Sequence, residues 1–236
     1  MDARKAPCPC GSGKRYKSCC YARDRARQRI DAARAVAAEG QRAVDEVLRV
    51  FLPLIESRGE HVLACKEGCH ACCGNFVHVA MPEALHIAAW LGAPENAAVR
   101  ARFADKLPAW RAAGGDDLIA LERLLARNGG PPTDGPDREE YGRRGVAFGQ
   151  KGNLCPFNEA GRCEIYPVRP NVCRAVLVLD NADHCVPGHG QPRRISHPML
   201  EQAVYEAGER AARAADELGA VERALPEAVA DASTRG

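Results

Sequence analysis

Twelve cysteines constrain this chain of 236 residues more than any other feature of its sequence. They lie in an N-terminal group at residues 8–20 and in two later groups, at residues 65–73 and 155–185. We find no secretory signal at the start, and no segment approaches the roughly 20 apolar residues of a membrane span. We therefore expect a cytoplasmic protein. Because thiols stay reduced there, the cysteines are expected to be metal ligands rather than disulfide partners.

The segments between the cysteine groups carry helical patterns. Apolar residues recur at helix-like intervals over residues 21–57, where Gly40 is a candidate break between two helices. Further signals predict helices at 82–92, at 95–128 (one or two helices) and at 198–230, a loop at 129–137 and a short strand at 175–179. The sequence thus predicts a mainly α-helical fold, in which a helical domain with irregular metal-binding cysteine loops is joined to a small N-terminal zinc knuckle.

Three parts are predicted along the chain: a knuckle at residues 1–22, a helical linker at 23–60 and a cysteine-cluster domain at 61–236. Residues 1–29 carry nine Lys and Arg side chains against two acidic ones, a local charge of +7. The whole chain carries only +2, so the remainder is net acidic. The basic knuckle suits an acidic protein surface, while a plain solvated arm, nucleic acid and the ribosome stay open as alternatives. The sequence does not determine the oligomeric state.

The N-terminal group reads CPCGSGKRYKSCC over residues 8–20. Cys8 and Cys10 are followed by a glycine-rich turn and by two adjacent cysteines, Cys19 and Cys20. Four thiolates match the tetrahedral coordination of zinc, whose sulfur ligands lie about 2.3 Å from the metal. Such a segment has almost no apolar core, so it needs the metal to stay folded. The alternative is a reactive cysteine tail that binds no metal.

This segment resembles the SEC-C motif, a zinc knuckle found at the C-terminus of the SecA translocation ATPase and attached to many other bacterial proteins. The usual last ligand in SecA is histidine, and Cys20 corresponds to a common cysteine variant. The resemblance implies that Cys8, Cys10, Cys19 and Cys20 bind zinc. It also implies that the knuckle docks to a protein partner or to the ribosome.

The main cysteine set consists of two halves that are far apart in the sequence. The first half is Cys65, Cys69, Cys72 and Cys73, and the second is Cys155, Cys163, Cys173 and Cys185. Eight thiolates exceed one tetrahedral site, so they suit two metal ions or one [4Fe–4S] cluster with cysteines left over. Thiolates bind both zinc and iron, and the number of cysteines favours iron. His70 and His184 are expected to support the site or to lie at the surface, because sulfur ligands are already abundant.

We expect the two halves to meet and to share metal. The second half spreads its cysteines over about 30 residues, and closing such a span costs chain entropy unless something pins it. Metal shared with the first half would hold this span closed and offset the entropy cost. Cys65 to Cys173 are the seven expected ligands, and Cys185 is an eighth candidate. The competing hypothesis is two independent zinc sites, one in each half.

Two coupled signatures carry a second resemblance. Residues 68–73 read GCHACC and are followed by VHVAMPEALHIAAWLG, and residues 155–174 read CPFNEAGRCEIYPVRPNVCR. In this order they resemble the YkgJ-like cysteine-cluster family, a zinc- or iron-chelating domain with a CxxCxxCC signature. Asn158 departs from the family pattern, and the second signature begins late in the sequence because residues 95–150 precede it. The C-x3-C-x2-C spacing also matches radical SAM enzymes, but their (β/α) barrel does not suit a chain that is helical around the motif.

Two arginines beside the second half are candidate cofactor-binding residues. Arg169 and Arg174 flank Cys173, where guanidinium groups can offset the charge of a thiolate cluster and donate hydrogen bonds to sulfur. Tyr166 is a candidate to pack beside the cluster. The alternative is ordinary surface charge on a turn that is defined by proline.

We therefore expect a metal-binding module rather than an enzyme. The alternative is a cluster-containing enzyme that acts on protein, because some relatives of the cysteine-cluster family are associated with lysine methylation of flagellin. The sequence offers no glycine-rich nucleotide loop after a strand, so it names no catalytic residue or nucleotide cofactor. The expected cofactors are zinc in the knuckle and zinc or an iron–sulfur cluster in the main domain.

Overall fold

The computed structural model describes residues 3–57, 63–65, 68–179 and 181–235. Within these residues, the α-helices are α1 (Tyr21–Ser57), α2 (Met81–Gly92), α3 (Ala97–Asn128), α4 (Gly135–Gln150), α5 (Asn171–Ala175), α6 (Pro198–Leu218) and α7 (Leu225–Arg235). The strands are β1 (His78–Val79), β2 (Asn158–Glu159), β3 (Arg162–Cys163), β4 (Val178–Leu179), β5 (Arg193–Arg194) and β6 (Arg223–Ala224). The fold is mainly α-helical, as the sequence predicts.

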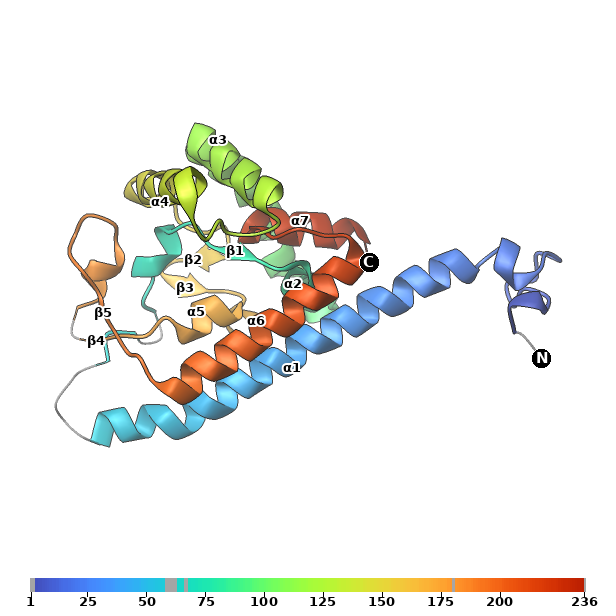
Figure 1. Cartoon of the computed structure of the whole chain (residues 1–236), viewed down its shortest axis with the longest axis horizontal. Helices are drawn as coiled ribbons and strands as arrows, with labels where there is room; N and C mark the ends of the chain where they lie inside the picture. Colours follow the sequence, from blue (N-terminus) through green and yellow to red (C-terminus); the bar gives the residue numbers. More distant parts are fainter. Residues whose placement is uncertain (1–2, 58–62, 66–67, 180, 236) are drawn as a thin grey trace.

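The long helix α1 forms the edge of the molecule and extends beyond it (Figure 1). Its C-terminal part lies alongside α6, and it also contacts α2 and α5. Its N-terminal part projects away from the main body and carries the knuckle at its tip. The periodic residues Ala33, Ala37, Val44 and Leu48 are all buried, which explains why this amphipathic helix packs along the domain. The knuckle itself lies at the far end of that arm.

Two apolar clusters hold the domain together. The larger one joins α2, α3, α4 and α7, and its fully buried side chains include Ile87, Leu121, Phe148 and Phe157. The smaller cluster joins α1 and α6 to the cysteine loops through Val44, Leu48, Leu177 and Leu200. Cys155 and Cys163 pack against the larger cluster, and Cys65 packs against the smaller one. The main cysteines therefore lie where the two clusters meet the loops.

The strands are short and form three antiparallel pairs, β1 with β6, β2 with β3 and β4 with β5. The described residues contain no parallel sheet, so the fold differs from the barrel of radical SAM enzymes. The short strand expected within 175–179 is present as β4. These small sheets fix the loops that carry cysteines rather than forming a core of their own.

Several sequence predictions need correction in detail. Gly40 does not divide the first helix, because α1 is continuous and Gly40 instead lets it approach α6. A Cβ atom at Gly40 would lie 2.9 Å from Cβ of Ala207. Helix α4 begins at Gly135, inside the expected loop, and was not anticipated. The helical segment at 198–230 is two helices separated by β6.

The segment 95–128 forms one assigned helix with a sharp interruption. Gly115 has φ 53° and ψ −138°, a backbone conformation that side-chain-bearing residues rarely adopt, so α3 is two helical pieces in one run. Residues 58–62, where the predicted linker ends, lie outside the described residues. None of the helices that the structure describes is both long and apolar enough to cross a membrane.

Candidate metal centres

The four knuckle cysteines converge on one point. The ligand atoms of Cys8, Cys10, Cys19 and Cys20 all lie within 4.8 Å of one another. Sγ of Cys10 lies 3.3 Å from that of Cys8 and 3.5 Å from that of Cys19, and the Cys19 and Cys20 sulfurs are 3.8 Å apart. Tetrahedral zinc with sulfur ligands at about 2.3 Å requires sulfur–sulfur distances of about 3.8 Å. The four thiols therefore fit one zinc ion.

Local backbone contacts produce this convergence. The chain reverses through Gly11 and Gly13, whose φ angles of 77° and 71° favour glycine. The amide of Cys8 donates to the carbonyl of Lys14 at 2.8 Å, which closes the loop between the two cysteine pairs. Each of these contacts spans only a few residues, which explains why the sequence alone could predict the ligand set.

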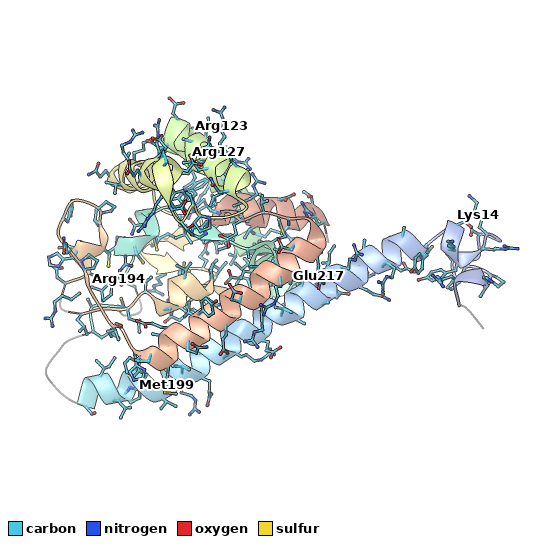
Figure 2. The ribbon with its side chains drawn as sticks, viewed as in Figure 1. Lys14, Arg123, Arg127, Arg194, Met199 and Glu217 are labelled. Atoms are coloured by element: carbon cyan, nitrogen blue, oxygen red, sulfur yellow. The ribbon has the colours of Figure 1, made fainter. Side chains whose placement is uncertain are left out.

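A polar contact fixes the knuckle to its helix. The Tyr16 hydroxyl donates to Asp24 at 3.0 Å, and the amide of Asp24 donates to the carbonyl of Cys20 at 2.9 Å. Helix α1 begins at Tyr21, directly after the last cysteine. Lys14 lies on the knuckle, apart from the main body of the molecule (Figure 2). The knuckle is thus presented to solvent on a helical arm.

Hydrogen bonding among the knuckle thiols shifts their proton affinities in opposite directions. Hydrogen bonds from Ser12 and Cys8 lower the pKa of Cys10 to about 6. Hydrogen bonds to Cys8 and Cys10 raise the pKa of Cys20 to about 12. Cys10 is therefore the first of the pair to ionise, and a metal must displace the proton of Cys20 to use it as a ligand.

The two halves of the main cysteine set meet in space. The amide of Cys155 donates to the carbonyl of Cys73 at 2.8 Å. The amide of Val178 donates to Sγ of Cys65 at 3.2 Å. Asn75, which closely follows the first half, donates to the carbonyl of Cys185 at 2.9 Å. Segments separated by about 80 to 110 residues in the sequence are thus joined at several points.

Cys72 is the common neighbour of the set. A negative charge on Cys72 would raise the pKa values of cysteines from both halves, which are Cys65, Cys155, Cys163, Cys173 and Cys185. Burial of the thiol is the largest cause of each of these five increases. It raises the pKa of Cys155 to about 12 and that of Cys185 to about 11. A hydrogen bond with Cys73, and then burial, raise the pKa of Cys72 itself. These thiols are neutral without metal, so metal binding must release their protons.

The main set is more open than the knuckle. Among the described residues, it contains no three cysteines whose Sγ atoms all lie within 4.8 Å of one another. Its eight thiols are nevertheless partly buried, with none fully exposed. The donor chemistry suits zinc or iron, and the spacing leaves room for a ligand set that closes when metal binds.

Arg169 carries a positive charge that acts on thiols of both halves of the main set. Its charge opposes the raised pKa values of Cys65, Cys72, Cys163 and Cys173, which come from both halves. Its Cζ atom lies 3.9 Å from the centre of the Tyr166 ring, a cation–π contact. Its Nε atom is buried and has no hydrogen-bond partner. A buried guanidinium donor without a partner, beside thiols, fits an anionic metal–thiolate group.

Arg174 has a different position. Its guanidinium donates to Asp45 at 2.5 Å and to the carbonyls of Arg169 and Pro167 at 2.8 Å and 2.5 Å. It is buried, and two of these hydrogen bonds fix the loop before α5, while the third joins it to α1. Arg174 therefore lies behind the Arg169 backbone, and its guanidinium is already engaged with three acceptors.

The two histidines beside cysteines lie at loop contacts. Nδ1 of His70 is 3.5 Å from the carbonyl of Gly68. The ring of His184 lies against Gly190, where an added Cβ atom would come within 2.7 Å of the ring.

Sequence reasoning missed the polar residues behind the second half. Gln41 on α1 is buried and donates to the carbonyls of Val168 and Arg169, both at 3.1 Å. Glu83 on α2 is buried and accepts from the amide of Asn171 at 2.9 Å. The sequence offers one signal for this support. Gln41 is a polar residue on the face of α1 that Ala37 and Val44 bury, so it needs a hydrogen-bond partner there.

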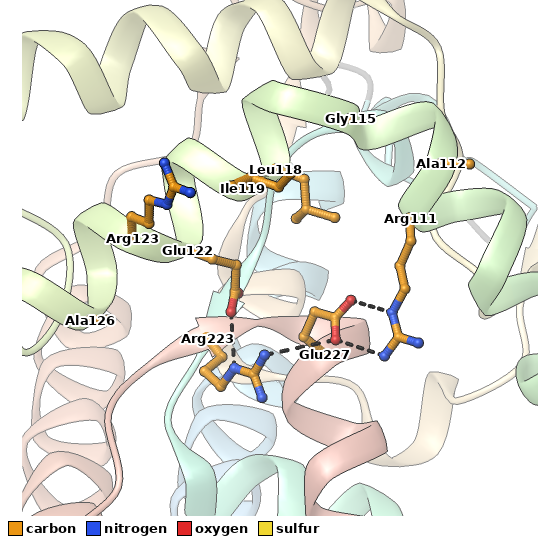
Figure 3. A pocket seen from close by; sticks show the side chains of 10 residues that line it. All are labelled: Arg111, Ala112, Gly115, Leu118, Ile119, Glu122, Arg123, Ala126, Arg223 and Glu227. Atoms are coloured by element: carbon orange, nitrogen blue, oxygen red, sulfur yellow. Dashed lines mark hydrogen bonds and ion pairs between the residues drawn. The ribbon is translucent and has the colours of Figure 1, made fainter.

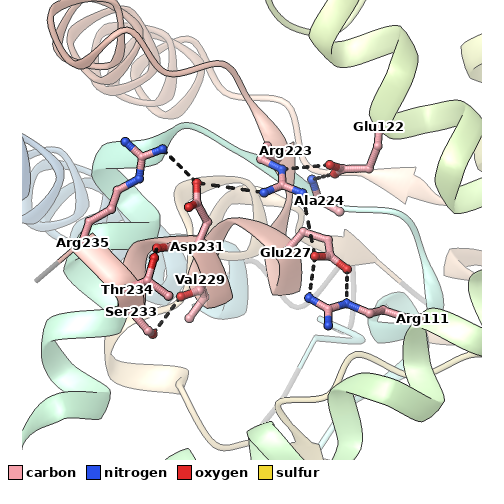
Figure 4. Close-up of polar contacts among 10 residues, drawn as sticks. All are labelled: Arg111, Glu122, Arg223, Ala224, Glu227, Val229, Asp231, Ser233, Thr234 and Arg235. Carbon is pink, nitrogen blue, oxygen red and sulfur yellow. Dashed lines mark hydrogen bonds and ion pairs between the residues drawn. The ribbon is translucent and has the colours of Figure 1, made fainter.

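A cavity of about 550 Å³ lies between α3 and α7, and no cysteine lines it (Figure 3). Its carboxylates are engaged in ion pairs. Glu227 accepts from Arg111 at 2.6 Å and 2.8 Å, and Glu122 accepts from Arg223 at 2.9 Å. Glu122 also accepts from the amide of Ala224, just before α7 (Figure 4). These pairs attach α7 to α3 and give the cavity a structural explanation.

Comparison with known families agrees with this geometry. Residues 64–187, more than half of the chain, match the family described as "Putative zinc- or iron-chelating domain", with the signature CxxCxxCC. The chain belongs to this family. The match begins beside Cys65 and ends just after Cys185, so it encloses both halves of the main set. Membership and the four-cysteine knuckle together support metal binding.

The knuckle has its own relatives. Residues 4–22 match the SEC-C motif. A stretch of 21 residues is 81% identical to Protein translocase subunit SecA 1 of Rhodopirellula baltica, and it covers 9% of this chain and 2% of that protein. The likeness is therefore confined to the knuckle. No solved structure matches the chain.

Proposed function

We propose that this protein is a metal-binding module with two thiolate centres, a zinc knuckle that docks to a protein partner and a main centre that holds zinc or an iron–sulfur cluster. The observation that supports this proposal most strongly is the convergence of the four knuckle sulfurs, which all lie within 4.8 Å of one another. Family membership supports the second centre. The two centres lie on different parts of the chain, with α1 between them.

The main centre is proposed to use cysteines from both halves. Support comes from the backbone bond between Cys155 and Cys73 and from the position of Cys72 among thiols of both halves. Cys65, Cys69, Cys72, Cys73, Cys155, Cys163 and Cys173 are the proposed ligands, with Cys185 as an eighth candidate. The buried Nε of Arg169 would donate to a metal-bound sulfur and offset its negative charge.

The number of thiols bears on the metal. Eight cysteines exceed the four ligands of one zinc, so the centre would hold two zinc ions or an iron–sulfur cluster. A cluster bound by four thiolates is anionic, and the positive charge of Arg169 favours that choice. When bound, such a cluster would supply electron transfer, whereas zinc would supply structural stability.

The docking proposal depends on the arm. The knuckle lies at the tip of α1, apart from the main body, so a partner can reach it without contacting the main centre (Figure 2). Its relative is a segment of a protein translocase subunit, which supports a protein partner. The basic residues at positions 1–29 suit an acidic surface on that partner, and the ribosome stays an alternative.

The test is elemental analysis and absorption spectroscopy of protein purified without oxygen. We expect the wild-type chain to contain zinc together with iron and inorganic sulfide, or additional zinc. Cys19→Ser should remove about one zinc equivalent and leave the main-centre metal in place. Cys173→Ser should do the reverse. A wild-type protein that contains no metal, or a Cys19→Ser protein with unchanged zinc, would contradict the proposal.

A further inference from the structure

Helix α1 does more than carry the knuckle, because its buried face reaches the loop behind the main centre. That loop runs from Pro167 to Pro170 and leads into α5, which bears Cys173. Helices α1 and α5 are in contact, and the loop lies beside them. The residues that join the helix to the loop are polar: Gln41 is buried, and the side chain of Asp45 is 51% exposed.

Gln41 makes the first connection. Its side chain is 4% exposed, and its Nε2 atom donates to two successive carbonyls, those of Val168 and Arg169, both at 3.1 Å. A buried amide donor with two backbone acceptors fixes the path of the loop at this point. An apolar side chain at position 41 would leave both carbonyls without this donor.

Asp45 makes the second connection, one helical turn further along α1. It accepts from Arg174 at 2.5 Å, and Arg174 also donates to the carbonyl of Arg169 at 2.8 Å. The Arg169 carbonyl therefore accepts from both Gln41 and Arg174. Two residues of α1, one directly and one through Arg174, hold the backbone from which the Arg169 side chain extends.

The Arg169 side chain has no such structural partner of its own. Its Nε atom is buried and unpaired, and its one described contact is the ring of Tyr166. In the described part of the chain it forms no ion pair with a carboxylate. We propose that Gln41 and Asp45 of α1 are positioning residues, which hold Arg169 in place as the hydrogen-bond donor to metal-bound sulfur in the main centre.

This inference rests on the proposed main centre and adds a role for the knuckle-bearing helix. It implies that substitutions on α1 change the metal environment of cysteines on other elements. Groups that support metal ligands from behind typically change metal affinity by about 10- to 100-fold when they are lost. Gln41 and Asp45 would affect the metal only through Arg169, so we expect their loss to change metal affinity by about 10-fold, the lower end of this range.

The experiment uses the full-length chain with Cys19→Ser, so that cobalt(II) reports on the main centre alone. Gln41→Leu and Asp45→Asn are compared with Asp45→Glu, which keeps the carboxylate, and with Glu46→Gln. Glu46 is the matched control, because it is the neighbouring carboxylate on α1 and pairs only with the exposed Arg49. The measurements are the sulfur-to-cobalt charge-transfer band, the rate of cobalt release to a chelator, and thermal unfolding of the metal-free protein.

We expect Gln41→Leu and Asp45→Asn to shift the band and to release cobalt about 10-fold faster. Asp45→Glu and Glu46→Gln should resemble the parent. The inference is overturned if both variants keep the parent band and release rate, whether or not metal-free stability falls. If Gln41→Leu does not fold, Asp45→Asn decides alone, since its side chain is half exposed. A parent that binds no cobalt would instead overturn the proposed main centre.

Discussion

The knuckle and the main centre bring their cysteine thiols together in different ways. The knuckle takes four cysteines from 13 consecutive residues and aligns them by local turns, with Cys8 and Cys20 as its buried residues. The main centre takes cysteines from segments far apart in the chain and places them against two apolar clusters. We expect the knuckle to depend on metal for its fold, because it has almost no apolar core, whereas the main domain has a core that can support its cysteines without metal.

Removing metal should produce the largest difference in stability between the two regions. After chelation, the knuckle should unfold, because zinc contributes about 10–16 kcal/mol to folding in comparable short peptides. The helices around Leu121 and Phe148 should persist, because their side chains are fully buried in the apolar core. Trypsin should then cut at Lys14 and Lys17 while the helical domain resists. Equal loss of protection in both regions would refute this contrast, and Cys19→Ser provides the control without a chelator.

Cys163→Ser tests whether the two halves of the main set depend on each other. If metal is shared, the variant should lose metal and become less stable throughout the domain, including α2, which follows Cys73. The measurement is metal content combined with a proteolysis map. Loss of one metal ion with unchanged protection around residues 65–73 would favour two independent sites, and Cys19→Ser should leave the domain unaffected.

The contrast between the regions also explains what the sequence could predict. The knuckle ligands follow from spacing alone, because Gly11, Gly13 and the bond from Cys8 to Lys14 are local. The helical class follows from periodicity. The meeting of the two halves was predicted from chain entropy, but the contacts that produce it, such as the amide of Cys155 on the carbonyl of Cys73, span the whole fold.

The residues that sequence reasoning missed depend on tertiary contacts in the same way. Gln41 becomes a support for the second half only when α1 lies against α5, and no local pattern encodes that approach. In the sequence alone, Gly40 is a candidate break, because glycine weakens isolated helices. In the fold it is a point of close helix packing, where Ala207 of α6 leaves no room for a side chain.

A third prediction tests packing in the main domain independently of metal. Gly40→Ala should reduce the free energy of unfolding by about 1–3 kcal/mol, because the new Cβ would lie 2.9 Å from Cβ of Ala207. Gly208→Ala is the matched control on α6, where an added Cβ meets nothing within 4 Å. It should stabilise the helix by about 0.5–1 kcal/mol. Chemical denaturation measures both, and equal effects would show that α1 and α6 are packed differently.

The smallest expected effect lies in the α3–α4 contact. Asp117 is bound by Lys151 at 2.7 Å and Arg144 at 2.9 Å, and these hydrogen bonds lower its pKa in the folded state. A lowered pKa stabilises the fold above the unfolded value of about 3.9, and that contribution disappears as pH falls through the folded value. Asp117→Asn should therefore cost about 0.5 kcal/mol at neutral pH and less near pH 3.

Denaturation at the two pH values checks this prediction, with metal content as the accompanying measurement. Neither centre should lose metal in Asp117→Asn, because its two partners are Arg144 on α4 and Lys151 directly after α4, and neither is a cysteine. A metal loss in this variant would mean that the main centre is coupled to the whole domain rather than to the loops around it.

The most direct test of the account is cadmium NMR of the full-length chain loaded with ¹¹³Cd, in which couplings to cysteine Hβ protons identify the ligands of each metal. We predict one resonance coupled only to Cys8, Cys10, Cys19 and Cys20. At least one other resonance should couple to cysteines from both 65–73 and 155–185. Main-domain resonances that each couple to cysteines of a single half would contradict the shared centre.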